Sequence, residues 1–246
     1  MISVTILTKN SEKHLKQVLE STASFPEVIL FDNGSEDRTF EIAQEFNNVK
    51  IIQGEFKGFG ATHNEASSHA SHDWILSVDS DEILTPELVE EIHHLTLNTR
   101  NVYSIPRQNF YRGKWIRWCG WYPDRQYKLY YRKTTSYCTS QVHESIRIEQ
   151  LFPIPLKHHL KHYPYENIRD FLEKMQRYSD LFARQYQGKR KSTLFTAVSH
   201  SAFTFFKSYF LKRGILGGKE GFEISAYNAI TAFYKYLKLS EYNRKI

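Results

Sequence analysis

The stretch that decides the fold is Trp74-Ile75-Leu76-Ser77-Val78-Asp79-Ser80-Asp81-Glu82, in which an apolar run ends in a cluster of carboxylates. A buried strand with Asp-x-Asp at its carboxyl end presents two carboxylates at the edge where open α/β sheets bind ligands. Neighbouring carboxylates repel each other unless a cation lies between them, and oxygen ligands of this kind suit Mg²⁺ or Mn²⁺. The alternative is an acidic helix N-terminus, because Thr85-Pro86-Glu87 opens a helix directly downstream.

The chain before residue 100 alternates between apolar runs typical of strands and segments with helical spacing. This alternation predicts a parallel sheet built from βαβ units. We expect strands at residues 2–8, 28–31, 49–52 and 74–78, and helices at residues 11–22, 39–46 and 59–70.

After residue 100 the pattern changes. Strands are expected at 103–106 and 127–131, followed by aromatic helices at 166–186, 194–212 and 220–238. We therefore predict a catalytic domain over residues 1–165, with a ligand-binding half at 1–100 and an acceptor half at 101–165. Residues 166–246 would form a helical, basic and aromatic extension.

The formal net charge of +6 conceals an uneven distribution. Residues 1–100 hold 7 Lys and Arg against 17 Asp and Glu, whereas the remaining residues hold 26 against 10. This division indicates that the second half meets an anionic partner, and nucleic acid, a phosphorylated acceptor and an anionic membrane surface all qualify.

Residues 194–211 fall short of the roughly 20 apolar residues of a spanning helix. They suit either an interfacial amphipathic helix or a helix packed on the catalytic domain.

The chain begins directly with a strand, without a basic segment or a cleavage site before it, which predicts a cytoplasmic protein.

Polar side chains follow three of the predicted strands, at Thr8-Lys9-Asn10, at Asp32-Asn33-Gly34-Ser35 and at Asp79-Ser80-Asp81. Because the carboxyl ends of parallel strands share one edge of a sheet, these groups should lie close together. An ionised carboxylate at the second strand end accepts hydrogen bonds from a base N–H or a ribose hydroxyl. The alternative is that Asp32 to Ser35 form only a turn and a helix cap.

The segment Lys57-Gly58-Phe59-Gly60-Ala61-Thr62-His63-Asn64 places glycines before a helix. Glycines allow the backbone to approach a ligand, and a helix N-terminus favours anions. The segment is neither a GxGxxG fingerprint nor a Walker A loop, which argues against a dinucleotide oxidoreductase and a P-loop NTPase.

Four motifs in this order resemble family 2 glycosyltransferases: Leu7-Thr8-Lys9-Asn10, Asp32-Asn33-Gly34-Ser35-x-Asp37-x-Thr39, Gly58-x-Gly60-Ala61-x-x-Asn64 and Asp79-x-Asp81. The resemblance implies the GT-A fold, an α/β fold with a Rossmann-like, mostly parallel mixed sheet flanked by helices, and inversion of the anomeric centre.

Later features resemble, more loosely, a bacterial subgroup that adds sugars to the lipopolysaccharide inner core. They are Arg107, Gly113 with Trp121-Tyr122-Pro123-Asp124, Val142-His143-Glu144, His162-Tyr163 and Gly217-Gly218-Lys219-Glu220-Gly221. This sequence carries Lys128 where relatives usually have Arg, which keeps the charge and loses a bidentate donor.

The resemblance implies a role for each matching residue. Asp32 would hydrogen-bond the nucleotide base, and Asp79 would contact the ribose. Asp81 would bind a divalent metal, Mn²⁺ or Mg²⁺, that bridges the diphosphate. His162 is a candidate further ligand, or else a structural histidine in a loop. The other residues of the nucleotide-sugar site would be Thr8, Asn10, Asn33, Gly58 and Asn64.

Inverting transfer needs a carboxylate that takes the proton of the acceptor hydroxyl. Glu144 is the preferred candidate and Asp124 the competing one, although Asp124 also suits a turn after Pro123. Arg125 and Lys128 are candidates for stabilising charge on the leaving group.

The expectation is thus a metal-dependent inverting glycosyltransferase that uses a nucleotide-diphosphate sugar, UDP-linked, and acts on a lipid-anchored or phosphorylated glycan such as lipopolysaccharide core. Peripheral contact with an anionic membrane is expected, and binding to nucleic acid is not. The rival interpretations are a nucleic-acid-binding protein and a nucleotidyltransferase that uses a nucleoside triphosphate.

Overall fold

The computed structural model describes residues 1–138 and 145–244 of the 246-residue chain. The chain divides into two compact units. The first comprises Met1–Arg107 and Asp124–His162, and the second comprises Gln108–Pro123 and Tyr163–Ile246. In this division residues 108–123 lie with the C-terminal helices, and the domain boundaries drawn from the sequence stay a prediction.

The first unit contains four parallel strands, which are neighbours in the order β3 (Val49–Gln53), β2 (Glu27–Asp32), β1 (Ile2–Thr8) and β4 (Trp74–Asp79). The sheet continues past β4 through antiparallel pairing with β8 (Arg125–Tyr131). Beyond β8 follow β6 (Asn101–Tyr111), β10 (Leu160–Tyr165) and β5 (Glu82–Leu84), while β7 (Lys114–Trp115) and β9 (Phe152–Pro155) pair with β6. The predicted mixed α/β sheet is confirmed, with parallel pairing among β1 to β4 and largely antiparallel pairing beyond β4.

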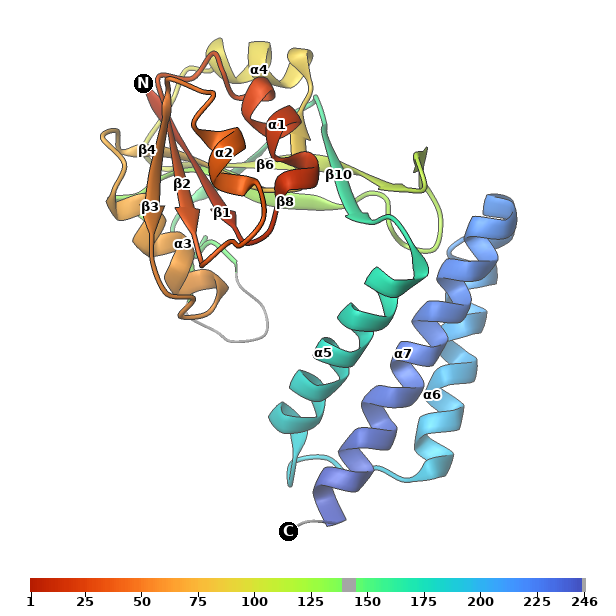
Figure 1. Ribbon diagram of the computed structural model, residues 1–246. Coiled ribbons are helices and arrows are strands. Elements are labelled where there is room, and N and C mark those ends of the chain that lie inside the picture. The colour runs from red at the N-terminus through yellow and green to blue at the C-terminus, as the bar shows by residue number, and fades with distance from the viewer. Residues whose placement is uncertain (139–144, 245–246) are drawn as a thin grey trace. The chain divides into compact units, whose positions relative to one another are not determined.

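Helices cover both faces of the parallel strands (Figure 1). Val4, Leu30 and Leu76 share one core cluster with residues of α1 (Glu12–Ser21), α2 (Thr39–Ala43) and α4 (Pro86–His93). Ile29 and Ile75, their neighbours along the strands, belong to a second cluster, and α3 (Phe59–Ser68) packs against β1 and β2. Side chains alternate between the faces of a strand, so a strand covered on both sides is apolar throughout.

The strand register brings the predicted ligand edge together. Thr8 pairs with Asp32 across β1 and β2, and Leu7 pairs with Asp79 across β1 and β4. The carboxyl ends of these three strands therefore lie side by side, as the βαβ pattern predicts.

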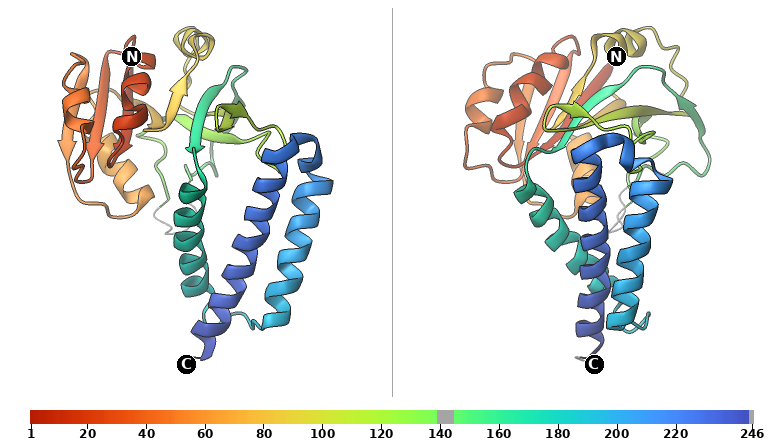
Figure 2. Two further views of the ribbon diagram at one scale, coloured as in Figure 1. Left: turned by 45° about the vertical axis from the view of Figure 1, so that its right-hand side comes forward. Right: turned by 90° about the vertical axis from the view of Figure 1, so that its right-hand side faces the viewer.

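The second unit is built on three long helices, α5 (Ile168–Tyr186), α6 (Leu194–Phe206) and α7 (Gly218–Arg244). A π-helical turn, η1 (Lys207–Leu211), and a 3₁₀ turn, η2 (Gly214–Gly217), connect α6 to α7. Both α5 and α6 pack against α7, and they lie on opposite sides of it (Figure 2). The three predicted helices are confirmed, and α7 runs six residues past the predicted end at 238.

The second unit has its own core, in which Phe171 of α5 and Ile224 of α7 cluster with Tyr111, Ile116 and Cys119. Within the ranges that the structure describes, no helix is long and apolar enough to cross a membrane.

Gly221 marks the closest approach between backbone segments of the second unit. A Cβ atom at this position would lie 1.9 Å from the carbonyl oxygen of Gly214. Because backbone atoms cannot move aside as the end of a side chain can, only glycine fits at the start of α7 here.

We expect Gly221→Ala to lower the free energy of unfolding of the helical unit by about 1–3 kcal/mol, because the added methyl group forces η2 away from α7. Urea denaturation followed by far-ultraviolet circular dichroism measures the effect. Glu241→Ala, at an exposed position of the same helix, is the control. Equal denaturation midpoints for Gly221→Ala and the wild type would contradict the argument.

Candidate functional site

At the edge formed by β1, β2 and β4, the hydroxyl of Thr8 is buried and has no hydrogen-bond partner among the residues that the structure describes. The carbonyl oxygen of Thr8 accepts a hydrogen bond from the Asn33 amide, at 3.0 Å. Buried polar atoms are nearly always satisfied, so an unsatisfied hydroxyl at this edge is consistent with a missing ligand partner.

The Asp32 carboxylate closes a turn. It is fully buried and accepts hydrogen bonds from the amides of Gly34 and Ser35, both at 2.9 Å, and from the Ser35 hydroxyl. This is the turn that the sequence offered as the alternative to a base-binding role. A carboxylate has about four lone-pair positions, so one remains for a ligand N–H.

Asn10 and Asn33 hold the loops around this turn. Asn10 has φ +52° and accepts a hydrogen bond from the Glu36 amide at 2.8 Å, while its own amide donates to the Ser35 hydroxyl. Asn33 donates to the carbonyl oxygen of Gly54 at 3.0 Å. Both side chains thus fix the backbone at the ligand edge.

Gly58 and Asn64 lie at and within α3. Gly58 has φ +98° and precedes the first turn of the helix. The Asn64 amide donates to the carbonyl oxygen of Tyr137 at 3.0 Å and accepts from its N–H at 2.9 Å. In this structure Asn64 therefore anchors the segment that leads to residues 139–144.

A buried charge network joins the Asp79 end of β4 to β8. The Lys128 ammonium lies 3.0 Å from Asp79 Oδ2 and 2.7 Å from Glu82 Oε2. Glu82 is fully buried, also accepts from the Asp79 amide at 2.9 Å, and lies 3.4 Å from Arg107 Nη1. The sequence analysis assigned no role to Glu82. In the sequence, its position directly after Asp-x-Asp is the feature that could have pointed to a role in the site.

This network sets the protonation of its members. Burial alone would raise the pKa of Asp79, but the attraction of Lys128 outweighs it and holds the pKa well below the usual range. Burial likewise opposes protonation of Lys128, yet Asp79 and Glu82 outweigh it and raise its pKa. Lys128 is therefore a permanent cation between two anions. The structure assigns it to these carboxylates, and its predicted contact with the leaving group stays a prediction.

Asp81 and His162 come together from distant parts of the chain. His162 stands opposite Glu82 in the pairing of β10 with β5, and its Nε2 lies 3.6 Å from Asp81 Oδ2. Two ligands at about 2.1 Å from one ion lie about 3–4 Å apart, so this spacing fits a shared divalent metal. Over residues 1–138 and 145–244 no group of three or more His, Cys, Asp or Glu could hold a metal ion. A metal here would need oxygen atoms from a substrate or water, as Mg²⁺ and Mn²⁺ commonly have.

Of the two candidates for the general base, only Asp124 belongs to the residues that the structure describes. Asp124 Oδ2 accepts from Arg107 Nε and Nη2, both at 2.8 Å, and its Oδ1 accepts from Gln126 at 2.9 Å. A carboxylate held by an arginine binds a proton weakly. Glu144 lies outside the described residues.

Arg125 does not join the charge network. Its Nη1 donates to the carbonyl oxygens of Leu156, at 3.0 Å, and Ser104, at 3.4 Å.

His63 of α3 is a further buried group that the sequence analysis left without a role. Its Nδ1 lies 3.3 Å from the Ser77 hydroxyl, and its ring stacks on Tyr137 with centroids 4.4 Å apart. Burial outweighs the attraction of Asp79 and lowers the pKa of His63 to about 4, so the ring is neutral at physiological pH.

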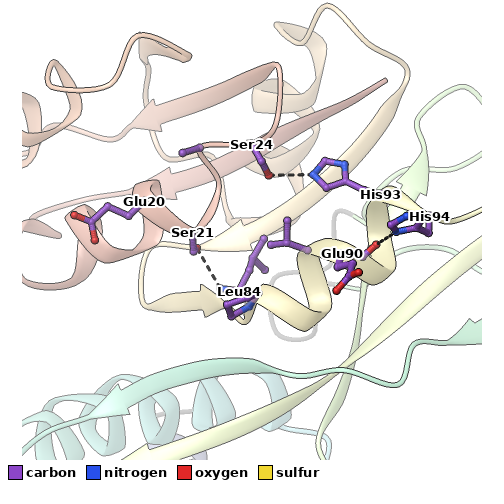
Figure 3. Close-up of a pocket in the computed structure, with 10 residues that line it drawn as sticks. Glu20, Ser21, Ser24, Leu84, Glu90, His93 and His94 are labelled. Atoms are coloured by element: carbon purple, nitrogen blue, oxygen red, sulfur yellow. Dashed lines mark hydrogen bonds between the residues drawn. The ribbon is translucent and has the colours of Figure 1, made fainter.

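A separate surface hollow of about 540 Å³ lies between the end of α1 and α4. Its lining includes Ser24, whose hydroxyl lies 3.0 Å from His93 Nε2, and Leu84, whose amide donates to Ser21 (Figure 3). None of the predicted site residues lines it, so the ligand edge remains the candidate site.

Fold and site together define an α/β enzyme with an acidic ligand edge at the carboxyl ends of parallel strands. Residues 3–151 match Glycosyl transferase family 2, and the chain belongs to that family. The predicted enzyme class and family are thereby confirmed.

Among curated proteins, an uncharacterized glycosyltransferase of Rickettsia typhi is 29% identical over 259 residues, covering 99% of this chain and 88% of the relative. The poly(ribitol-phosphate) β-N-acetylglucosaminyltransferase TarS of Staphylococcus aureus is 34% identical over 100 residues, covering 36% of this chain and 18% of that protein. Among solved structures, the mannosyltransferase PcManGT from Pyrobaculum calidifontis, in complex with GDP-Man and Mn²⁺, aligns with TM-score 0.58 at 14% identity. This alignment covers 96% of this chain and 86% of that one, and it shows a shared fold.

The neutral state of His63 predicts a pH dependence of stability. In the unfolded chain the imidazole binds a proton below pH 6.5, whereas in the folded chain it does so only near pH 4. The free energy of unfolding therefore falls as the pH drops through this window, by about 3 kcal/mol.

Denaturation of His63→Gln across the same pH window should show a flatter dependence, because this residue cannot be protonated. The exposed His94 provides the control variant His94→Gln, which should follow the wild type. An unchanged slope in His63→Gln would contradict the assignment.

Proposed function

We propose that this glycosyltransferase transfers a sugar from a nucleotide-diphosphate sugar, UDP-linked, with inversion of the anomeric centre and with the help of a divalent metal. The observation that carries the proposal is the approach of His162 to Asp81, 3.6 Å apart, beside the strand ends that carry Thr8 and Asp32. This proximity supports a metal site next to a nucleoside pocket, the arrangement that a bound nucleoside diphosphate requires.

Each part of the donor would have its own protein groups. Asp32 would accept a hydrogen bond from the base, Thr8 and Asn10 would line the pocket, and Asp79 would contact the ribose. Asp81 and His162 would hold Mn²⁺ or Mg²⁺, which supplies positive charge for the leaving diphosphate. The Lys128 ammonium offsets one of the two negative charges of Asp79 and Glu82, which reduces the repulsion between this edge and a diphosphate.

The acceptor hydroxyl must lose its proton as it attacks the anomeric carbon from the face opposite the leaving diphosphate. Glu144 is the proposed base, and Asp124 is the competitor. The hydrogen bonds of Asp124 with Arg107 and Gln126 support Glu144, since a carboxylate that is engaged on both oxygens accepts a proton less readily.

For the acceptor we propose a lipid-anchored or phosphorylated glycan of the lipopolysaccharide inner-core type, met at the cytoplasmic face of the membrane. The looser motif resemblance and the basic second half of the chain support this. A similar stretch in TarS, which acts on a poly(ribitol-phosphate), fits a phosphate-bearing acceptor.

Asp81→Asn should weaken Mn²⁺-dependent binding of UDP by at least about tenfold, because the variant loses a charged metal ligand. His162→Gln should weaken it less, since a neutral ligand is replaced by another neutral group. Calorimetric titration of UDP with and without Mn²⁺ measures both. Glu90→Gln, an exposed carboxylate on α4, is the control for lost surface charge. Equal UDP affinity with and without Mn²⁺, or in Asp81→Asn and the wild type, would contradict the metal proposal.

Glu144→Gln should lower kcat by about 10²–10⁴-fold while UDP binding stays intact, because only proton removal is lost. Transfer is measured with a panel of UDP-hexoses and lipopolysaccharide inner core as acceptor. Asp124→Asn is the paired variant, and a smaller loss is expected for it. A full rate in Glu144→Gln together with loss of transfer in Asp124→Asn would reverse the assignment.

A further inference from the structure

Helix α6 presents an apolar face to the outside of the helical unit. The face consists of Leu194, Phe195, Val198, Phe203 and Phe206, each between 49% and 81% exposed. Leu194 adjoins Phe195, and the later positions follow at intervals of three or five residues, so at 3.6 residues per turn all five lie on one half of the helix and form one broad face. Exposed apolar surface that is gathered in this way marks an interaction site.

Two serines of α6 and η1, Ser201 and Ser208, instead form hydrogen bonds inside the helical unit. Ser201 donates to the carbonyl oxygen of Ala229 at 2.9 Å. Ser208 is buried and accepts hydrogen bonds from Ser225 at 3.0 Å and from Asn228 at 3.1 Å. These two hydroxyls are thus engaged inside the unit, whereas the phenyl rings of Phe195, Phe203 and Phe206 lie outside.

The apolar face continues beyond α6. Phe222 of α7 packs edge-on against Phe205 and Tyr209, with centroids 5.8 Å and 5.9 Å apart, and is itself half exposed. Leu211 of η1 and Leu216 of η2 are more than 60% exposed. The face is thus a feature of the whole α6–α7 hairpin.

The charged residues around this face in the sequence are all basic. Residues 181–219 contain eight Lys and Arg and no Asp or Glu, and α6 itself carries neither sign. Exposed basic residues lie at both ends of the helix, with Lys189, Arg190 and Lys191 before it and Lys207 and Lys212 after it. An uncharged apolar stripe between two basic ends is complementary to acyl chains bordered by anionic headgroups.

We propose that the apolar face of α6 is the docking surface of this protein for an anionic lipid membrane, with α6 lying in the plane of the interface. At 13 residues α6 is about 20 Å long, shorter than the roughly 30 Å of a bilayer core. The inference deepens the proposed function, since a lipid-anchored acceptor would be met at this surface.

Co-sedimentation of the full chain with lipid vesicles tests the proposal. The wild type should bind vesicles of phosphatidylcholine with phosphatidylglycerol more tightly than vesicles of phosphatidylcholine alone, and added salt should weaken the binding. Phe195→Gln/Phe206→Gln should bind at least about tenfold more weakly, because two phenyl rings no longer enter the interface. Ile168→Gln/Leu172→Gln, which changes two exposed apolar residues of α5, should bind as the wild type does.

Two results would overturn the proposal. One is unchanged vesicle binding by Phe195→Gln/Phe206→Gln. The other is a wild type that binds no vesicles but self-associates in analytical ultracentrifugation, with the double variant monomeric, which would make a second copy the occupant. UDP titration of the same variants separates this proposal from the enzymatic one. Intact UDP binding without vesicle binding rejects only the docking surface, and the reverse rejects only the donor site.

Discussion

The buried ammonium of Lys128 is the interaction on which the ligand edge depends. It lies between Asp79 and Glu82, at 3.0 Å and 2.7 Å, where β8 runs next to β4. Without this cation, the Asp79 and Glu82 carboxylates would repel each other. With it, the pKa of Asp79 stays well below its usual range. Asp79 thus keeps its negative charge at the carboxyl end of β4. Asp81, two residues further along the chain, lies close to His162.

A second cation extends this arrangement. Arg107 bridges Glu82 and Asp124, so the network runs from β5 through β6 to the start of β8. The pKa of Arg107 is raised, because its two carboxylate partners outweigh the effect of burial. A chain of alternating charges fixes the relative positions of strands that are joined by long connections. The site is thereby held rigid on strands, while its turns contribute the nucleoside-binding groups.

The helical unit distributes its polar and apolar side chains differently from the first unit. The hydroxyls of Ser201 and Ser208 form hydrogen bonds inside the helical unit, and much of its apolar surface lies outside. Burial of apolar surface therefore stabilises this unit only in part, and close backbone packing such as that of Gly221 on Gly214 carries more of its specificity. Both units thus have an apolar core, and the second also carries an apolar outer face.

The sequence alone determined the order of strands and helices, the sheet edge at which the polar strand ends gather, and the family, because these follow from periodicity and from short local motifs. It also paired Asp81 with His162, though only through resemblance. It did not reveal that Glu82 and Arg107 connect the site, that Asn64 holds Tyr137, or that Arg125 turns to backbone carbonyls. Those contacts arise because β8 lies between β4 and β6, which brings side chains from distant parts of the chain together across the sheet. Charge pairing over such distances leaves no period in the sequence, so only the tertiary structure decided which charged groups stay available to a ligand.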